Sequence, residues 1–248
     1  MINMKIIASD YDGTLNHGGI DDIKRAAIRQ WRRAGNLFGI VSGRSADDLL
    51  EIPRRNNFEY DFLIASNGAV ILGSNGQPEW ESRCDGALAM PLLEFIFSLG
   101  CTWASIHTET RLIIDLDDNE RLEDEFTLGT LPEIRYFNQI STILPDESSA
   151  QKVTDAIRER FGKVLNPLRN GRCIDVVSVD MNKAVGLYKF LEIIGAQSEN
   201  LITVGDNIND MHMIAEFRSY AMENAVQSIK DTADCEIAGI TELIFKEM

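Results

Sequence analysis

Two short acidic segments lie near opposite ends of the chain, and each follows an apolar run typical of a buried strand. Asp10-Tyr11-Asp12-Gly13-Thr14 comes after the run 6–8, and Gly205-Asp206-Asn207-Ile208-Asn209-Asp210 comes after the run 201–204. In an open parallel sheet, the loops at the carboxyl ends of the strands form the binding crevice. If both runs are strands of one sheet, the two acidic segments meet at one edge of it.

Strand and helix patterns alternate in both end regions of the chain, which favours right-handed βαβ units and a parallel sheet. We expect strands at residues 4–9, 37–41, 62–65, 201–204 and 219–222. We expect helices at residues 21–34, where Asp21 provides the cap and Gly35 the end, and from Ser45 onward with Asp48 in the capping box. Further helices are expected at residues 182–194, 208–215 and 225–232, and the segment 240–246 closes the chain. The ends of the chain therefore predict one α/β domain.

The middle of the chain has a different pattern. It predicts a helix at residues 85–99 interrupted by Pro91, a hairpin of strands 102–106 and 111–116, and a short acidic helix at 120–126. A strand at 139–144, a helix from Asp146 to Phe161, and strands at 163–165 and 173–177 follow. Helices between hairpin-like strands indicate an α+β module with an antiparallel sheet. We expect this module at residues 82–178, inserted into a core domain made of residues 1–81 and 179–248.

Charge and composition exclude several classes of function. The formal net charge is −15, so the general field of the protein opposes binding to nucleic acid or to an anionic membrane. No charged and apolar leader opens the chain, and no apolar run approaches the roughly 20 residues that span a bilayer. The four cysteines form no C-x-x-C pair, which predicts reduced, mostly buried thiols in a cytoplasmic protein. Oligomeric state stays open.

The first acidic segment has the residues for covalent phosphoryl chemistry. Asp10 and Asp12 are two residues apart, so their side chains point the same way in an extended stretch. One carboxylate can attack phosphorus as a nucleophile, and the other can protonate the leaving oxygen and later deprotonate water. Gly13 permits a tight turn, and the Thr14 hydroxyl can orient a neighbouring carboxylate. The alternative is a loop Asp pair that caps the following turn.

Three further segments offer groups that suit a phosphate and a metal ion. Ser42-Gly43-Arg44 lies between a strand and a helix, where a hydroxyl and backbone N–H groups suit an anion, although a plain turn is the alternative. Lys183 stands at a helix start, where the helix dipole disfavours a cation, which hints at a role in neutralising phosphate. In the second acidic segment, Asp206 and Asp210 can hold Mg²⁺ or orient its ligands, and Asn209 can donate to phosphate. An Asx turn at a helix start is the alternative there.

Together these motifs resemble the haloacid dehalogenase superfamily, and within it the Cof-type phosphatases with a C2-type cap. Asp10-x-Asp12-Gly-Thr, Ser42-Gly-Arg, Lys183 and Gly-Asp206-x-x-Asn209-Asp210 occur in the order of that family, and Ser66-Asn67-Gly68-Ala69 also matches. The resemblance spans the whole chain and implies a Rossmann-like core with a parallel sheet and an inserted α+β cap. Two departures stand beside the motif lysine, where Asp180 and Ala184 replace the usual glycines.

The resemblance implies a role for each matching residue. Asp10 would be the nucleophile and a Mg²⁺ ligand, and Asp12 the general acid and base, with its backbone carbonyl on the metal. Asp206 and Asp210 would complete or support the metal site. The phosphoryl group would be bound by Ser42, Gly43, Lys183 and Asn209. The resemblance also implies that four further residues contact the substrate or support the residues that do: Tyr11, Thr14, Arg44 and Asn67.

We therefore expect a Mg²⁺-dependent phosphoric monoester hydrolase that acts on small phosphorylated metabolites, such as sugar phosphates, through an aspartyl-phosphate. Two alternatives stay open at this point. A phosphosugar mutase of the same superfamily would return the phosphoryl group to a second hydroxyl. A protein that binds a phosphorylated metabolite without turnover would not need Asp12 as an acid and base.

Overall fold

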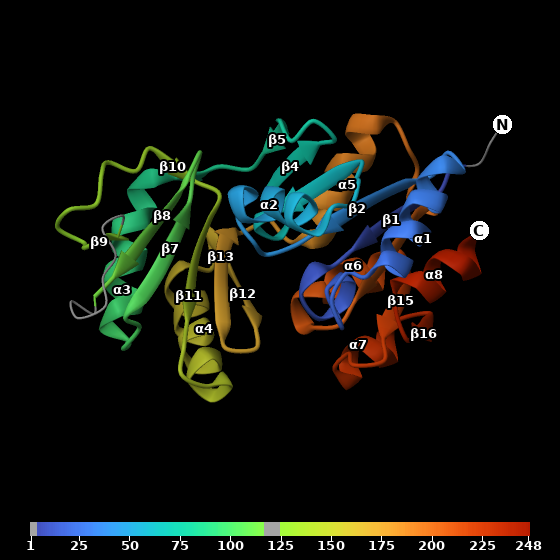
Figure 1. Ribbon diagram of the computed structural model, residues 1–248. Coiled ribbons are helices and arrows are strands. Elements are labelled where there is room, and N and C mark those ends of the chain that lie inside the picture. The colour runs from blue at the N-terminus through green and yellow to red at the C-terminus, as the bar shows by residue number, and fades with distance from the viewer. Residues whose placement is uncertain (1–3, 117–124) are drawn as a thin grey trace. The chain divides into compact units, whose positions relative to one another are not determined.

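The computed structural model describes residues 4–116 and 125–248, and these residues divide into two compact units (Figure 1). The first unit combines both ends of the chain, Met1–Trp80 and Asn182–Met248, and the second is Glu81–Met181. Each unit has its own cluster of buried apolar side chains.

The first unit is built on a sheet whose order within the described residues is β16-β15-β14-β1-β2-β3-β4-β5. From β16 to β3 the neighbouring strands are parallel, and β4 is antiparallel to β3. The mixed α/β fold with a parallel-rich sheet confirms the expected fold class. The strands are β1 Ile6–Ser9, β2 Leu37–Val41, β3 Phe62–Ala65, β4 Val70–Gly73, β5 Pro78–Glu81, β14 Leu201–Gly205, β15 Arg218–Met222 and β16 Cys235–Ile237.

The helices of the first unit begin where the capping residues predict. Asp21 accepts a hydrogen bond from the N–H of Lys24, and Ser45 accepts one from that of Asp48. The helices are α1 Asp22–Arg33, α2 Ala46–Asn56, α5 Lys183–Ile194, α6 Met211–Glu216, α7 Gln227–Thr232 and α8 Ile240–Glu247. Short helical turns are η1 Tyr11–Leu15, η2 Ser66–Gly68, η4 Ser198–Asn200 and η5 Ile208–Asp210. The helix expected at 208–215 is thus divided between η5 and α6.

The second unit, green to yellow in Figure 1, has a sheet in the order β12-β13-β11-β7-β8-β9. Its neighbouring strands are antiparallel except for β8 and β9, so the antiparallel α+β module is confirmed. The elements are β6 Cys84–Asp85, η3 Gly86–Leu88, α3 Ala89–Ser98, β7 Trp103–His107, β8 Arg111–Asp115, β9 Glu125–Phe126, β10 Tyr136–Phe137, β11 Gln139–Ile143, α4 Glu147–Phe161, β12 Leu165–Asn170 and β13 Cys173–Ser178.

Several expectations need correction. Pro91 does not interrupt a helix, because α3 begins only at Ala89 and a proline in the first turn breaks no backbone hydrogen bond. The strand expected at 163–165 is β12, which begins at Leu165. The helix expected at 120–126 falls mostly outside the described residues, and its last two residues form β9. Of the four free cysteines, Cys173 and Cys235 are exposed, so the thiols are not mostly buried.

No helix within residues 4–116 and 125–248 is long and apolar enough to cross a membrane.

Candidate active site

The sheet brings the two acidic segments together. β1 and β14 are parallel neighbours with Ser9 opposite Val204, and the N–H of Asp10 donates to the carbonyl of Val204 at 2.9 Å. β2 lies on the other side of β1, so Ser42 follows its strand at the same edge. Parallel strands end at one edge of a sheet, and this is why the loops beginning at Asp10, Ser42 and Asp206 meet.

A glycine allows the closest approach between the two acidic loops. Gly13 has φ +84°, and a Cβ atom at this position would lie 2.4 Å from Oδ2 of Asp206. Only a residue without a side chain fits such a turn and such a contact. Next to it, the hydroxyl of Thr14 donates to Oδ1 of Asp206 at 2.8 Å. The turn after β1 therefore orients a carboxylate that comes from the loop after β14.

Lys183 reaches the site from the first turn of α5, which Asn182 caps by accepting from the N–H of Val185. The start of α5 packs tightly on η2, where a Cβ atom at Gly68 would lie 2.3 Å from the carbonyl oxygen of Asn182. The Lys183 side chain is fully buried. Burial opposes its charge, but two carboxylates outweigh that effect and raise the pKa of Lys183. The lysine is therefore a cation inside the protein.

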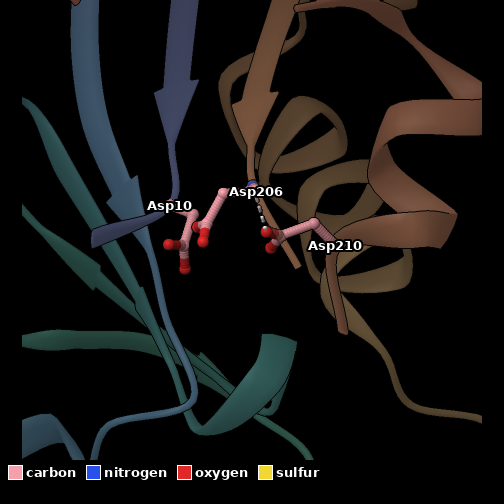
Figure 2. A group of neighbouring side chains, drawn as sticks. All are labelled: Asp10, Asp206 and Asp210. Carbon is pink, nitrogen blue, oxygen red and sulfur yellow. Dashed lines mark hydrogen bonds between the residues drawn. The ribbon is translucent and has the colours of Figure 1, made fainter. Parts of the chain in front are cut away.

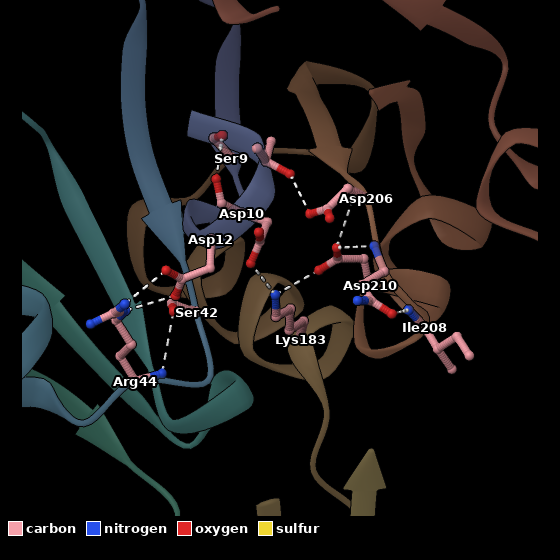
Figure 3. Close-up of polar contacts among 11 residues, drawn as sticks. Ser9, Asp10, Asp12, Ser42, Arg44, Lys183, Asp206, Ile208 and Asp210 are labelled. Atoms are coloured by element: carbon pink, nitrogen blue, oxygen red, sulfur yellow. Dashed lines mark hydrogen bonds and ion pairs between the residues drawn. The ribbon is translucent and has the colours of Figure 1, made fainter. Parts of the chain in front are cut away.

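Both carboxylate partners of Lys183 lie at the same distance from it (Figure 3). Its Nζ donates to Oδ1 of Asp10 at 2.6 Å and to Oδ1 of Asp210 at 2.6 Å. The other oxygen of Asp210 accepts from the backbone N–H groups of Asp206, at 3.0 Å, and Asn207, at 3.1 Å. Asp210 thus fastens the second acidic loop and positions the lysine against Asp10.

Three carboxylates gather at this point, and the set suits a divalent cation. Asp10, Asp206 and Asp210 each offer one oxygen within 4.8 Å of the others (Figure 2). Burial raises the pKa of Asp10 well above its usual value despite Lys183, and burial also raises that of Asp206. One ammonium faces three carboxylates, so a second cation would relieve the remaining negative charge. Carboxylate oxygens are ligands that Mg²⁺ favours.

Asp12 points away from this cluster toward Arg44 (Figure 3). The Arg44 guanidinium donates from Nε to Oδ2 of Asp12 and from Nη2 to Oδ1, both at 2.7 Å. The same guanidinium lies over the ring of Tyr11, 5.3 Å from its centroid. The Tyr11 ring itself is buried in the core of the first unit. Arg44 and Asp12 are both partly exposed, so their pair is accessible to a ligand.

The remaining residues singled out from the sequence also lie near the strand ends. Ser42 is buried, and its hydroxyl accepts from the N–H of Arg44 at 3.2 Å. The N–H of Asn67 donates to the carbonyl of Ser42 at 2.9 Å, which ties η2 to this loop. Asn209 is buried in η5, directly before Asp210. Gly43 lies between Ser42 and Arg44 in the same loop.

The two departures from the family pattern have different surroundings. Asp180 is an exposed residue of the turn that follows β13. Ala184 is fully buried in the core of the first unit, directly after the lysine. A methyl group therefore fits at position 184 without changing the start of α5.

Sequence reasoning missed two residues that support the site. The side chain of Asn224, in the loop after β15, donates to the carbonyl of Gly13 at 2.9 Å. The hydroxyl of Ser9 donates to the carbonyl of Asp10 at 2.7 Å. Asn224 had a detectable signal, because it follows an expected strand at the same sheet edge as Asp10 and Asp206. Ser9 had none, since a serine inside a strand is common.

Comparison with known proteins identifies the family of this chain. The chain matches the family model described as haloacid dehalogenase-like hydrolase over residues 7–242. A 5-amino-6-(5-phospho-D-ribitylamino)uracil phosphatase of Bacillus subtilis is 38% identical over 255 residues, which cover 92% of this chain and 90% of the relative. Another B. subtilis protein with the same activity in its name is 27% identical over 250 residues, covering 94% and 89%.

Solved structures share the fold. A haloacid dehalogenase-like hydrolase from Bacteroides thetaiotaomicron superposes with a TM-score of 0.80 at 22% identity, covering 99% of this chain and 100% of the other. The HAD subclass IIB sugar phosphatase BT4131 has a TM-score of 0.80 at 18% identity, covering 98% and 99%. At these identities the likeness shows the fold alone.

Proposed function

Since the chain belongs to the haloacid dehalogenase-like hydrolases and is a phosphatase of that family, we propose that it hydrolyses small phosphorylated metabolites with Mg²⁺ and through a phosphoryl group carried on Asp10. The observation that carries this proposal is the buried bridge from Asp10 through Lys183 to Asp210, with Asp206 beside it. In this arrangement the Asp10 carboxylate, the proposed nucleophile, lies next to the Lys183 ammonium group and to the carboxylate oxygens of Asp206 and Asp210.

Asp10 and Asp206 are the residues that would hold the metal ion directly. Asp210 already accepts from Lys183 and from two backbone N–H groups, so its role is to position the lysine and the loop. A bound Mg²⁺ would supply positive charge to the phosphoryl oxygens and shield the Asp10 carboxylate from them. The fit rests on the donor set, because three carboxylates each offer an oxygen within 4.8 Å of the others and a single lysine pairs with only two of them.

In the proposed reaction, a carboxylate oxygen of Asp10 forms a bond to phosphorus in line with the leaving oxygen. The bond from phosphorus to the leaving oxygen breaks, and Asp12 gives that oxygen a proton. Asp12 then takes a proton from water, which attacks the phosphorus, and the Asp10 carboxylate is released with inorganic phosphate. The positive charge of Lys183 beside Asp10 stabilises the charge on the phosphoryl oxygens, as positioned cations do in phosphoryl transfer.

Phosphoryl binding is assigned to groups at the same sheet edge. The Ser42 hydroxyl, the Gly43 backbone N–H, Lys183 and the Asn209 side chain are proposed to contact the phosphoryl oxygens. Ser42 and Asn209 are buried in separate loops, and each loop is fixed by neighbours that do not themselves react. Pre-fixed donors lose little freedom when the substrate binds, which favours catalysis.

The names of two relatives support a proposal for the substrate class. We propose that the second unit is the cap of the family and supplies the contacts to the leaving group. Two relatives are named for a phosphorylated ribitylamino compound, so phosphorylated sugars and polyols are the first compounds to test. Those relatives are phosphatases, which favours hydrolysis over the mutase reaction.

The test is a phosphate-release screen over sugar phosphates, polyol phosphates, nucleotides and p-nitrophenyl phosphate, with Mg²⁺ and with EDTA. The expected result is release that needs Mg²⁺ and disappears in Asp10→Asn, while Ser9→Ala keeps measurable turnover as the matched control. Asp10→Asn should fold, because Lys183 retains Asp210. Normal turnover by a folded Asp10→Asn protein would overturn the nucleophile assignment. Isomer formation without phosphate release would instead identify a mutase.

A further inference from the structure

A cavity of the first unit is lined by residues of α1, the end of α2 and the segment that follows α2. Its volume is about 170 Å³, and its lining includes Arg25 and Arg29 of α1, Arg54 of α2, Phe58 and Glu59. Three arginines around one cavity stand out in a chain whose formal net charge is −15. These arginines place several positively charged side chains close together on an otherwise acidic protein.

Three of the four arginines of α1, Arg25, Arg29 and Arg32, lie on one face of the helix because they are spaced by four and three residues. The outer two are engaged within the protein. Arg25 donates to the carbonyl oxygens of Ile20, at 2.7 Å, and Asn56, at 3.3 Å. Arg32 donates from Nε and Nη2 to the two carboxylate oxygens of Asp61, both at 2.9 Å, and also pairs with Glu59.

Arg29, between them, has no such partner. Its side chain makes no hydrogen bond or ion pair with the residues that the structure describes, and it lines the cavity opposite another helix. Arg54 pairs at 2.9 Å with Glu51, one turn earlier on α2, through Nη1 alone. The one carboxylate in the cavity lining, that of Glu59, is already held by Arg32. Arg29, which has no partner among the described residues, and Arg54, which uses only Nη1, are both exposed side chains that line one small cavity, so several of their N–H groups remain available to an anion.

We propose that this cavity binds a small anion of the phosphate type through Arg29 and Arg54. Guanidinium groups present N–H donors in a planar fork that matches two phosphate oxygens. The cavity is separate from the candidate active site, because Arg54 stands nine residues after Ser45, which places it roughly 14 Å along α2 from Ser45. The proposed anion site does not depend on the hydrolytic function.

The experiment is a calorimetric titration of the full-length chain with inorganic phosphate at constant, low ionic strength. Three proteins are compared: the unmodified chain, the double variant Arg29→Gln/Arg54→Gln, and the double variant Arg33→Gln/Arg55→Gln. The last pair removes the same charge from the same two helices, at exposed positions outside the cavity lining. Hydrolysis of p-nitrophenyl phosphate by all three proteins is measured in parallel.

The expected result is two binding events in the unmodified chain and in the Arg33/Arg55 variant. In the Arg29/Arg54 variant, the event that belongs to the cavity should weaken by about tenfold or more, which corresponds to the loss of one charge-assisted contact. The proposal would be overturned if every binding event of the unmodified chain persisted unweakened in the Arg29/Arg54 variant. Equal weakening in both variants would also overturn it, because that result would indicate a general effect of charge. Hydrolysis should stay unchanged, so failure of the catalytic proposal would show separately as the absence of turnover in all three proteins.

Discussion

Arg44 holds both carboxylate oxygens of Asp12, with N–H···O distances of 2.7 Å each. The backbone N–H of Arg44 also donates to the hydroxyl of Ser42. Arg44, the last residue of the Ser42-Gly43-Arg44 segment, therefore sets the orientation of the Asp12 carboxyl group, which is proposed to transfer the proton. A planar fork fixes this orientation, whereas a single charge would leave it free to rotate.

Arg44→Lys is accordingly expected to lower kcat by about tenfold, because lysine keeps the charge but cannot hold two oxygens in one plane. Steady-state kinetics with p-nitrophenyl phosphate measure the change. Arg55→Lys, on the exposed surface of α2, is the matched control and should leave kcat unchanged. A kcat equal to that of the unmodified protein in Arg44→Lys would mean that Asp12 does not depend on this pair.

Asp210 should be needed for both stability and catalysis. It is fully buried and accepts hydrogen bonds from Lys183 and from two backbone N–H groups. Asp210→Ala leaves these donors without that acceptor, and we expect the free energy of unfolding to fall by about 3 kcal/mol. Urea denaturation measures this loss.

The matched variant is Asp206→Asn, whose side chain is less buried and whose Oδ1 accepts from Thr14. It should lose Mg²⁺-dependent turnover while its urea midpoint stays close to that of the unmodified protein. If Asp210→Ala were as stable as Asp206→Asn, the positioning role of Asp210 would be wrong.

Lys24 should stabilise the segment that follows the catalytic turn. This buried lysine donates to the carbonyl oxygens of Leu15 at 2.7 Å, His17 at 3.1 Å and Gly19 at 2.7 Å. Lys24→Met keeps the length of the side chain but removes the donor, so we expect a loss of about 2–3 kcal/mol in the free energy of unfolding. The exposed Arg33→Met on the same helix should change it by less than about 0.5 kcal/mol. Equal urea midpoints for the two variants would contradict the prediction.

His107 should make the stability of the second unit depend on pH. Burial, assisted by the positive charge of Arg111, lowers the pKa of His107 from 6.5 to about 3. The folded protein keeps the ring neutral, whereas the unfolded chain binds a proton below pH 6.5. Stability from this group is therefore complete above that pH and is lost as the pH falls, at up to about 1.4 kcal/mol per pH unit.

His107→Gln isolates this contribution, because both proteins share every other titrating group. The comparison runs from pH 6.5, the pKa of the histidine in the unfolded chain, down to about pH 5. Over this range the free energy of unfolding of the unmodified protein should fall by about 1–2 kcal/mol more than that of the variant. Urea denaturation at each pH gives the two slopes. Parallel slopes would show that His107 is not buried in its neutral form.

Local patterns in the sequence were sufficient for most of the secondary structure. Asp21, Ser45, Asp146 and Asn182 each cap a helix where the sequence predicts one, since a cap involves residues only three positions apart. The short strands β4, β5 and β16 were not predicted. Such short strands, of which β5 and β16 form the edges of the sheet, carry too few residues for a clear period, and their pairing depends on a neighbouring strand.

The sequence by itself determined the order of the strands and helices and the residue types that follow each strand, because periodicity, caps and turns depend on near neighbours. Only the tertiary structure decided that Lys183 reaches Asp10 and Asp210, that Arg44 holds Asp12, and that Arg29 and Arg54 line the same cavity. These contacts join residues far apart in the chain. Their distances depend on strand order and helix packing, which no local pattern records.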